Sequence, residues 1–226
     1  VDIGMGRAGV AAGPATVALA REIAACEGLA FAGFMAWEAQ TMTIAEPAAK
    51  ERAVVAAIAR LVETAGDCRR IGLEVPIVSC GGTGTFPCCT RQPGITEVQV
   101  GGAIFSDIRY REGCHVDLPF ALTVLTTVTS RPTPTRIVVD AGRKAMSFDT
   151  AVPQPIGLPA HEPARGSAEH CTVELALASA MPAVGDRLEF VVGYSDTTIH
   201  LHEEILGLRR GRVERVWRVA GRGRLK

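Results

Sequence analysis

The sequence predicts an α/β domain over residues 1–115 followed by an antiparallel β domain over residues 116–226. In the first part, short continuous apolar runs alternate with segments of helical periodicity. That alternation is typical of parallel strands covered by helices. In the second part, runs rich in Val, Leu and Thr lack a helical period and are separated by Gly, Pro or Asp, as expected for antiparallel strands.

The elements of the first part follow from local signals. Pro14 suits the first turn of a helix. A later segment places Val54, Ile58 and Leu61 on one helical face, with charged residues outside. The expected elements are a strand ending near residue 5, a helix at 13–27, a strand at 29–37, a helix at 48–65, and strands at 75–79 and 96–100.

The second part contains six segments that we interpret as strands. Each is short, and turn residues separate it from the next, which indicates hairpins or tight connections. They cover residues 120–130, 135–139, 171–177, 187–192, 198–202 and 212–218.

The composition excludes several classes of function. Lys plus Arg and Asp plus Glu balance at 24 each in 226 residues, so there is no electrostatic case for binding nucleic acid or an anionic membrane. No apolar run approaches the ~20 residues of a membrane span. Seven cysteines without a spaced framework indicate free thiols in a reducing, cytoplasmic compartment.

The most informative stretch is Val-Ser-Cys-Gly-Gly-Thr-Gly-Thr at residues 78–85, directly after an apolar strand. Glycine lets backbone N–H groups turn inward and approach a ligand closely. Inward N–H groups with Ser and Thr hydroxyls form an anion-binding nest, for which phosphate is the expected ligand. A plain tight turn is the alternative interpretation.

Other polar residues follow the ends of the predicted strands. Sites in parallel α/β folds gather at the C-terminal ends of strands. Those ends carry Arg7, Trp37, the glycine loop, and Gln99 before Gly101-Gly102. A cation, an aromatic ring and a phosphate nest at one edge would suit a flat, phosphorylated heteroaromatic ligand.

At this point the sequence resembles a known family. Six segments, in order along the whole chain, are similar to motifs of the D-threonine aldolase and D-serine dehydratase branch of fold-type III pyridoxal-phosphate enzymes. They are residues 2–10, 78–85, 96–107, 138–147, 167–170 and 194–202. The resemblance implies the C-terminal half of an alanine racemase-like (β/α)8 barrel, comprising its last four strands, followed by the β domain.

The same resemblance implies a set of contacts to pyridoxal phosphate. Arg7 would bind the phenolic oxygen, and Gln99 would face the pyridine nitrogen, a position for which Glu97 could compete. Trp37 would line the ring face or pack in the core. The residues implied to hold the phosphate are Ser79, Gly82, Thr83, Gly101 and Gly102.

One departure from the family concerns lysine. The family's Schiff-base lysine precedes the arginine motif, whereas this chain has only Lys50, Lys144 and Lys226. We expect Lys50 on a solvated helix face, Lys144 in the β domain and Lys226 at the terminus. The resemblance therefore implies an N-terminally truncated fragment that is inactive alone by the family mechanism.

A second departure concerns the family's metal pair. Tyr194 stands where the family has histidine, and Asp196 keeps the second position, implying a Mn or Zn site at Asp196 with Tyr194 as a proton donor or acceptor. We expect both on one face of a strand. His200 and His202 also have zinc-ligand spacing, with surface histidines as the alternative. His170 is expected to reach the active site, or else to be structural.

The resulting expectation is a pyridoxal-phosphate-dependent lyase acting on small D-3-hydroxy amino acids, by retro-aldol cleavage or dehydration. The resemblance implies a homodimer for the full-length protein. Two alternatives stay open at this point. One is an amino-acid racemase or deaminase on the same scaffold, and the other is a non-catalytic half-barrel that binds a cofactor or a partner.

Overall fold

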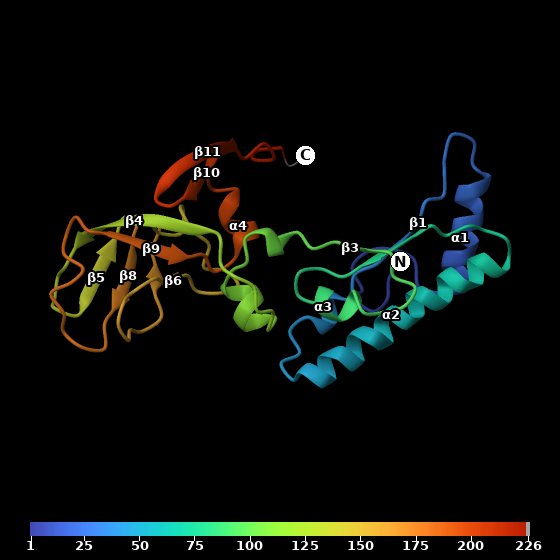
Figure 1. The fold of residues 1–226 in the computed structure, drawn as a ribbon, viewed down its shortest axis with the longest axis horizontal. Helices are drawn as coiled ribbons and strands as arrows, with labels where there is room; N and C mark the ends of the chain where they lie inside the picture. Colours follow the sequence, from blue (N-terminus) through green and yellow to red (C-terminus); the bar gives the residue numbers. More distant parts are fainter. Residues whose placement is uncertain (225–226) are drawn as a thin grey trace. The chain divides into compact units, whose positions relative to one another are not determined.

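A computed structural model describes residues 1–224, which fold into two compact units (Figure 1). Unit 1 comprises Val1–Ile104 and Glu112–Asp117, and unit 2 comprises Phe105–Arg111 and the chain from Leu118 onward. Lys226 lies outside the described residues. No helix in the described part of the chain combines the length and the apolar character needed to cross a membrane.

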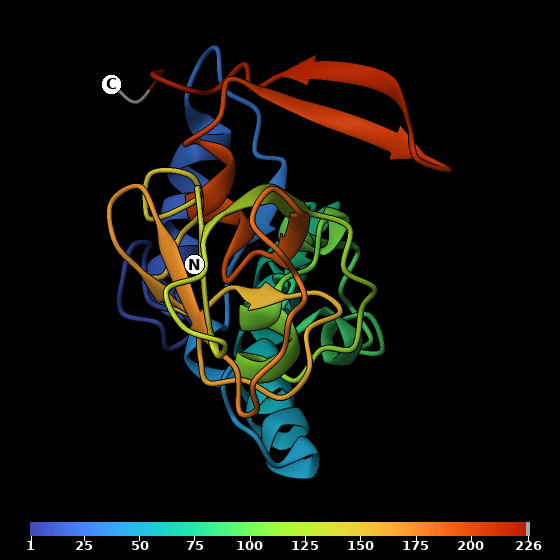
Figure 2. The same ribbon diagram turned by 90° about the vertical axis from the view of Figure 1, so that its left-hand side faces the viewer.

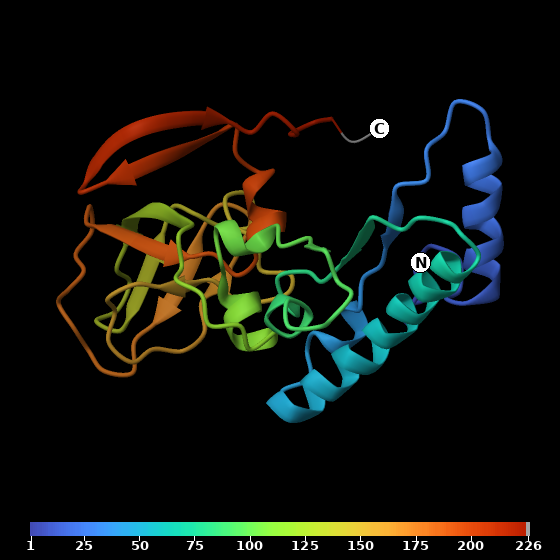
Figure 3. The same cartoon turned by 45° about the vertical axis from the view of Figure 1, so that its right-hand side comes forward.

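Unit 1 contains a three-stranded parallel sheet. Its strands are β1 (Gly33–Met35), β2 (Ile77–Cys80) and β3 (Glu97–Val98), in the order β1-β2-β3. The helices are α1 (Pro14–Ala25), α2 (Pro47–Arg70) and α3 (Phe86–Cys89), with short 3-10 turns η1 (Ala39–Thr41) and η2 (Gly102–Ile104). α1 lies beside the C-terminal half of α2 (Figure 3), where Gly13 N donates to Thr64 Oγ1 at 2.9 Å.

The predicted apolar face of α2 forms the core of unit 1. Val54, Ile58 and Leu61 are fully buried in a cluster that includes Phe34 and Val78 of the sheet. Burying such a side chain contributes about 1.5–3 kcal/mol, so this face fixes α2 on the strands.

α2 also carries a correction. Lys50 was expected in solvent, but it is only 7% exposed, and its Nζ donates to the carbonyl oxygen of Cys114 at 2.5 Å. Burial lowers the pKa of Lys50 from its ordinary value. Lys50 therefore ties α2 to the 112–117 segment of the same unit.

Three predicted strands of unit 1 are shorter than expected or absent. The run at 29–37 pairs only over β1, and the run at 96–100 only over β3. Residues 1–5 contribute an isolated bridge between Asp2 and Ala11 rather than a strand. Gly33 has a φ of +140°, and a Cβ there would lie 2.0 Å from Ile77 O. Only glycine lets the two backbones approach this closely, so the pairing of β1 with β2 starts at Gly33.

Unit 2 is built on a six-stranded antiparallel sheet, which confirms the predicted class. The strand order is β6-β9-β4-β5-β8-β7. The strands are β4 (Thr123–Ser130), β5 (Arg136–Val139), β6 (Gln154–Pro155), β7 (Arg165–Gly166), β8 (Cys171–Glu174) and β9 (Arg187–Val191). Val128, Ile137, Val173 and Phe190 form part of its core.

The C-terminal part of unit 2 differs from the prediction. Residues 198–202 are not a strand, because α4 (Ser195–Ile199) occupies this region. The buried carboxylate of Asp107 accepts from Ser195 N at 2.8 Å and Ser195 Oγ at 2.7 Å, which fixes the first turn of the helix. After it, β10 (Glu204–Arg209), which was not predicted, pairs with β11 (Arg212–Arg218) in a separate antiparallel ribbon (Figure 2).

Candidate functional site

The glycine loop follows β2 at the edge of the parallel sheet where the three strands end. Ala36 N donates to Ser79 O at 2.9 Å, and Gln99 N donates to Gly81 O at 3.0 Å. These bonds extend the pairing one residue beyond β1 and β3. Trp37, the loop and Gln99 therefore leave the sheet at a common edge, as the βα alternation predicted.

Arg7 is held near this edge by its own loop. Asp2 Oδ1 accepts from Gly4 N at 2.9 Å and from Gly6 N at 3.2 Å, and these two bonds lower the pKa of Asp2. The guanidinium carbon of Arg7 lies 5.0 Å from the centre of the Trp37 ring. That distance is within the range of a cation–π contact, so the aspartate-folded loop presents Arg7 to Trp37.

Trp37 in turn packs on the glycine loop. A Cβ built on Gly82 would lie 2.8 Å from Trp37 Nε1, closer than side chains approach one another. Only glycine lets the indole and the loop backbone meet at this distance. Arg7, Trp37 and Gly82, predicted from three distant segments, therefore form one continuous group.

Glu38 holds the glycine loop by hydrogen bonds from its buried side chain. It was not predicted as a site residue. Its side chain is fully buried and accepts from Gly81 N at 3.2 Å, from the Thr85 hydroxyl and from Cys89 Sγ at 3.4 Å. A buried carboxylate must be satisfied by such donors. Its signal in the sequence was an acidic residue directly after the apolar run at 29–37.

Two cysteines share this buried space. Among the described residues, Glu38, Cys80 and Cys89 are the one group of three potential metal ligands, with ligand atoms within 4.8 Å of one another. The hydrogen bond with Cys80, burial and the proximity of Glu38 raise the pKa of Cys89 well above its ordinary value, so it is a thiol that donates. We interpret this group as a hydrogen-bonded support for the loop.

A second network joins Ser79 to the neighbouring strand. Ser79 Oγ lies 2.6 Å from Glu97 Oε1 and 2.8 Å from Gln99 Nε2. A hydroxyl carries one proton and a carboxylate only accepts, so Ser79 donates to Glu97 and accepts from Gln99. The amide of Gln99 is thereby oriented, with its oxygen pointing away from Ser79.

The loop keeps N–H groups that no protein atom accepts from. Thr83, Gly84 and Gly102 are buried, and their backbone N–H groups donate to no acceptor in the described part of the chain. Thr83 Oγ1 accepts from Ala103 N at 3.1 Å, which brings the two glycine segments together. Buried unpaired N–H groups are rare, so this cradle is suited to an anion.

Gly101 of the predicted phosphate site differs from Gly81, a loop glycine that was not predicted to bind phosphate. Gly101 N donates to Gln99 O at 3.2 Å, and a Cβ on Gly101 would meet no protein atom within 4 Å. Gly81, in the loop itself, has a φ of +77°, which strongly favours glycine.

In unit 2, Tyr194 and Asp196 meet as predicted, although not on a strand. Tyr194 precedes α4 and Asp196 lies in its first turn, and Tyr194 Oη donates to Asp196 Oδ2 at 2.7 Å. The guanidinium of Arg109 lies 5.1 Å from the centre of the Tyr194 ring. Burial, then the hydrogen bonds with Asp196 and Tyr110, raise the pKa of Tyr194 well above its usual value, so its hydroxyl is protonated at neutral pH.

Comparison with known proteins agrees with these two units. Residues 1–108 match the family described as alanine racemase, N-terminal domain, and residues 121–208 match the putative serine dehydratase domain. The chain is similar to the D-threonine aldolase and D-serine dehydratase branch of the fold-type III enzymes. Its alanine racemase-like fold is thus confirmed.

Three relatives illustrate the similarity to this branch. A 3-hydroxy-D-aspartate aldolase of Paracoccus denitrificans (strain Pd 1222) is 34% identical over 99% of this chain and 59% of its own length. The D-threonine aldolase structure from Filomicrobium marinum has a TM-score of 0.93 and 30% identity over 100% of this chain and 63% of that one. A D-threo-3-hydroxyaspartate dehydratase variant in a metal-free form has a TM-score of 0.83 and 25% identity over 96% of this chain and 64% of that one. The chain thus spans about three fifths of the length of these relatives.

The histidines of unit 2 contact different partners. His170 is exposed, with its backbone N–H 3.3 Å from Ser167 Oγ. His202 Nε2 lies 2.6 Å from Ala145 O, and His200 Nδ1 lies 3.3 Å from Asp196 O. The shared strand face expected for His200 and His202 is wrong, because α4 and the turn after it replace the strand.

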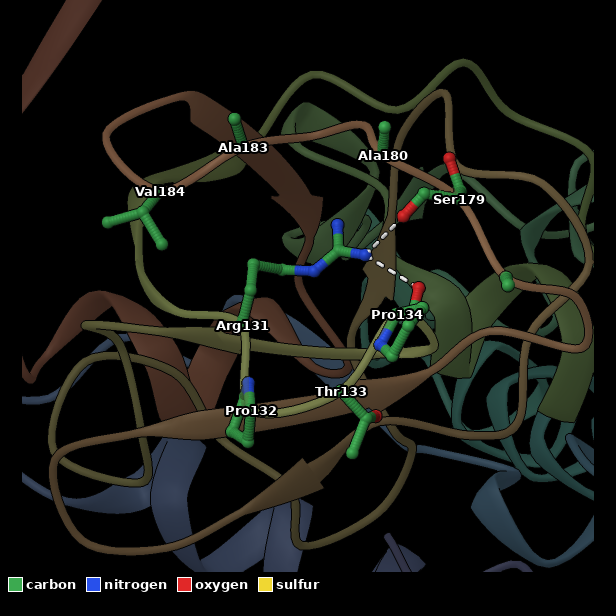
Figure 4. Close-up of a pocket in the computed structure, with 9 residues that line it drawn as sticks. Arg131, Pro132, Thr133, Pro134, Ser179, Ala180, Ala183 and Val184 are labelled. Atoms are coloured by element: carbon green, nitrogen blue, oxygen red, sulfur yellow. Dashed lines mark hydrogen bonds between the residues drawn. The ribbon is translucent and has the colours of Figure 1, made fainter.

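Two other features of unit 2 have a structural role and no part in the predicted site. Lys144 Nζ pairs with exposed Glu169 at 2.5 Å. A hollow beside β4 is lined by Arg131, Pro134, Ser179 and small apolar residues (Figure 4). The guanidinium of Arg131 is already used there, since it donates to the carbonyl oxygens of Pro134, Ser179 and Pro182. Neither feature contains a predicted cofactor residue.

Proposed function

We propose that the whole protein is a pyridoxal-phosphate-dependent lyase acting on D-3-hydroxy amino acids, and that this chain binds the phosphate end of the cofactor. The observation that carries the proposal is the cradle of buried N–H groups at Thr83, Gly84 and Gly102. The similarity to a 3-hydroxy-D-aspartate aldolase and a D-threonine aldolase supports it.

In this proposal the cradle residues bind the phosphate oxygens. The N–H groups of Thr83, Gly84 and Gly102 donate, while Gly82 and Gly101 keep the approach open. Ser79 acts through Gln99, because its own proton is given to Glu97.

The remaining contacts concern the ring of the cofactor. Trp37 borders the ring site, and Arg7 contacts the phenolic oxygen. Gln99 presents its amide oxygen, an acceptor, to the ring nitrogen, which selects the protonated ring. Pyridoxal phosphate, when bound, supplies an electron-withdrawing ring that weakens the bonds at the α-carbon of the substrate.

Tyr194 favours one of the two lyase reactions. Dehydration needs a proton for the departing β-hydroxyl, whereas retro-aldol cleavage removes the proton of that hydroxyl. Tyr194 keeps its proton, and it serves as the donor when its hydrogen bond to Asp196 is exchanged for one to the departing hydroxyl. A dehydratase is for this reason a second candidate activity beside the aldolase. His170 is kept as a candidate catalytic residue.

Product analysis of the whole protein tests the proposal. Retro-aldol cleavage of D-3-hydroxyaspartate yields glycine and glyoxylate, and dehydration yields oxaloacetate and ammonia. Binding of pyridoxal phosphate is followed separately by its visible absorbance. From D-threonine the corresponding pairs are glycine with acetaldehyde and 2-oxobutanoate with ammonia. A protein that binds the cofactor but forms no cleavage or dehydration products from either substrate is not a lyase of this class.

We also propose a cytoplasmic homodimer. The seven cysteines are all free thiols, which suits a reducing compartment. Size-exclusion chromatography with light scattering measures the oligomer directly, and a monomeric whole protein would contradict the second part.

A further inference from the structure

Three side chains of unit 2 surround Tyr194. Its Oη donates to Asp196 Oδ2 at 2.7 Å, and the Tyr110 ring packs edge-on with centroids 5.9 Å apart. The guanidinium of Arg109 lies 5.1 Å from the centre of the Tyr194 ring and donates no hydrogen bond within the described residues. An unpaired cation, a phenol and a carboxylate therefore share one small region.

This donor set is poorly suited to a divalent cation. Such ions bind carboxylate, imidazole or thiolate groups that offer free lone pairs. Here one oxygen of Asp196 already accepts the Tyr194 proton, and a metal would have to displace it. The Arg109 guanidinium beside the Tyr194 ring adds a positive charge, which disfavours a second cation in this region.

Within residues 1–224, no group of three potential metal ligands includes Asp196. The nearest histidine in sequence, His200, is directed to the backbone oxygen of Asp196, and His202 is directed to Ala145 O. The one three-ligand group among residues 1–224 is Glu38, Cys80 and Cys89, which belongs to unit 1. Asp196 thus remains a single exposed carboxylate.

A metal is implied at this position by the family resemblance, and one related dehydratase variant is described in a metal-free form. The side chains of this chain at that position do not suit a metal ion. We infer that Tyr194 and Arg109 exclude divalent cations from this position, which holds a phenol hydroxyl bonded to Asp196 instead of a metal ion. The inference rests on the proposed function only for its consequence, namely that chemistry at the β-hydroxyl proceeds without a metal.

Metal titration of the whole protein tests the inference. After dialysis against EDTA, the protein is titrated with Mn²⁺ and Zn²⁺ by calorimetry and with Co²⁺ by visible absorbance. We expect no stoichiometric site that Asp196→Asn removes. Tyr194→Phe, which keeps the ring beneath Arg109, should behave like the native protein in all three titrations.

A gain of binding supplies the positive arm. The double variant Tyr194→His/Arg109→Ala should acquire one Co²⁺ site at least ~100-fold tighter than any native binding, and adding Asp196→Asn should abolish it. Circular dichroism checks that each variant is folded. If a variant does not fold, the titration of the native protein alone decides whether a metal site is present. A folded double variant without a site would show that these two side chains are not what excludes the metal.

The two proposals can fail separately. A native Mn²⁺ or Zn²⁺ site that Asp196→Asn removes would overturn this inference and leave the lyase proposal standing. Absence of lyase products with no such site would overturn the lyase proposal and leave the inference standing.

Discussion

Ser79 Oγ lies 2.6 Å from Glu97 Oε1, so the single proton of Ser79 is committed to a carboxylate. The consequence reaches Gln99, whose amide nitrogen must then donate to Ser79 at 2.8 Å. Glu97 therefore acts as a positioning residue, because it fixes which atom of Gln99 is offered to a ligand. An exposed acidic residue at the start of β3 is thereby connected to the electronic state of the proposed cofactor ring.

Glu97→Gln tests that connection. A neutral amide can also donate to Ser79, so Gln99 is free to rotate and present nitrogen instead of oxygen. We expect the affinity for pyridoxal phosphate to fall roughly fivefold, equivalent to about 1 kcal/mol for one hydrogen bond. The ¹⁵N chemical shift of the labelled ring nitrogen should move toward its unprotonated value. Glu51→Gln, which removes an exposed pair with Arg91, is the matched control, and an unchanged shift in Glu97→Gln would refute the positioning role.

Glu38→Ala should destabilise the protein strongly. The change leaves the Gly81 N–H, the Thr85 hydroxyl and the Cys89 thiol without their buried acceptor. Unsatisfied buried donors cost about 1–3 kcal/mol each, so we expect the free energy of unfolding to drop by about 2–4 kcal/mol after relaxation. Urea denaturation measures this. Glu63→Ala, at an exposed position, should change the free energy of unfolding by less than about 0.5 kcal/mol. If Glu63→Ala lost as much stability as Glu38→Ala, the buried hydrogen bonds of Glu38 would not explain the effect.

The position of Glu38 illustrates what the sequence could and could not predict. Alternation of apolar runs and helices placed the C-terminal ends of β1, β2 and β3 close to where they lie. Because parallel strands share one direction, this gathered Trp37, the glycine loop and Gln99 at one edge. Which carboxylate turns inward depends on donors 43 to 51 residues away, at Gly81 and Cys89. Local patterns carry no information about such partners.

The same limit explains the errors. Lys50 was placed in solvent because its acceptor, Cys114 O, is 64 residues distant. The segment after Tyr194 was read as a strand from its β-branched residues, whereas Asp107, 88 residues earlier, binds Ser195 and fixes a helix. Tertiary hydrogen bonds outweigh a propensity difference of about 1 kcal/mol or less per residue.

Gly82→Ala should impair the proposed cofactor site without unfolding the protein. The new Cβ would lie 2.8 Å from Trp37 Nε1, so the indole must shift. We expect at least a tenfold loss of affinity for pyridoxal phosphate, followed by absorbance titration. Gly101→Ala meets no protein atom, so any loss of affinity there reports contact with the ligand itself. Gly221→Ala, also in open space, should leave affinity unchanged, and an equal effect of all three changes would contradict the site.

Cys171 should make stability fall in alkaline solution. Burial raises the pKa of its thiol to about 12, whereas an unfolded cysteine has a pKa of about 8.5. The unfolded chain loses this proton first, so the contribution is fully present below pH ~8.5 and is lost as the pH rises toward 12. Between these limits the loss is about 1.4 kcal/mol per pH unit. Unfolding free energies of the native protein and Cys171→Ala, measured by urea from pH 8 to 11, should converge as the pH rises. Exposed Cys26→Ala is the control, and parallel curves for the native protein and Cys171→Ala would show that the thiol does not stay protonated in the fold.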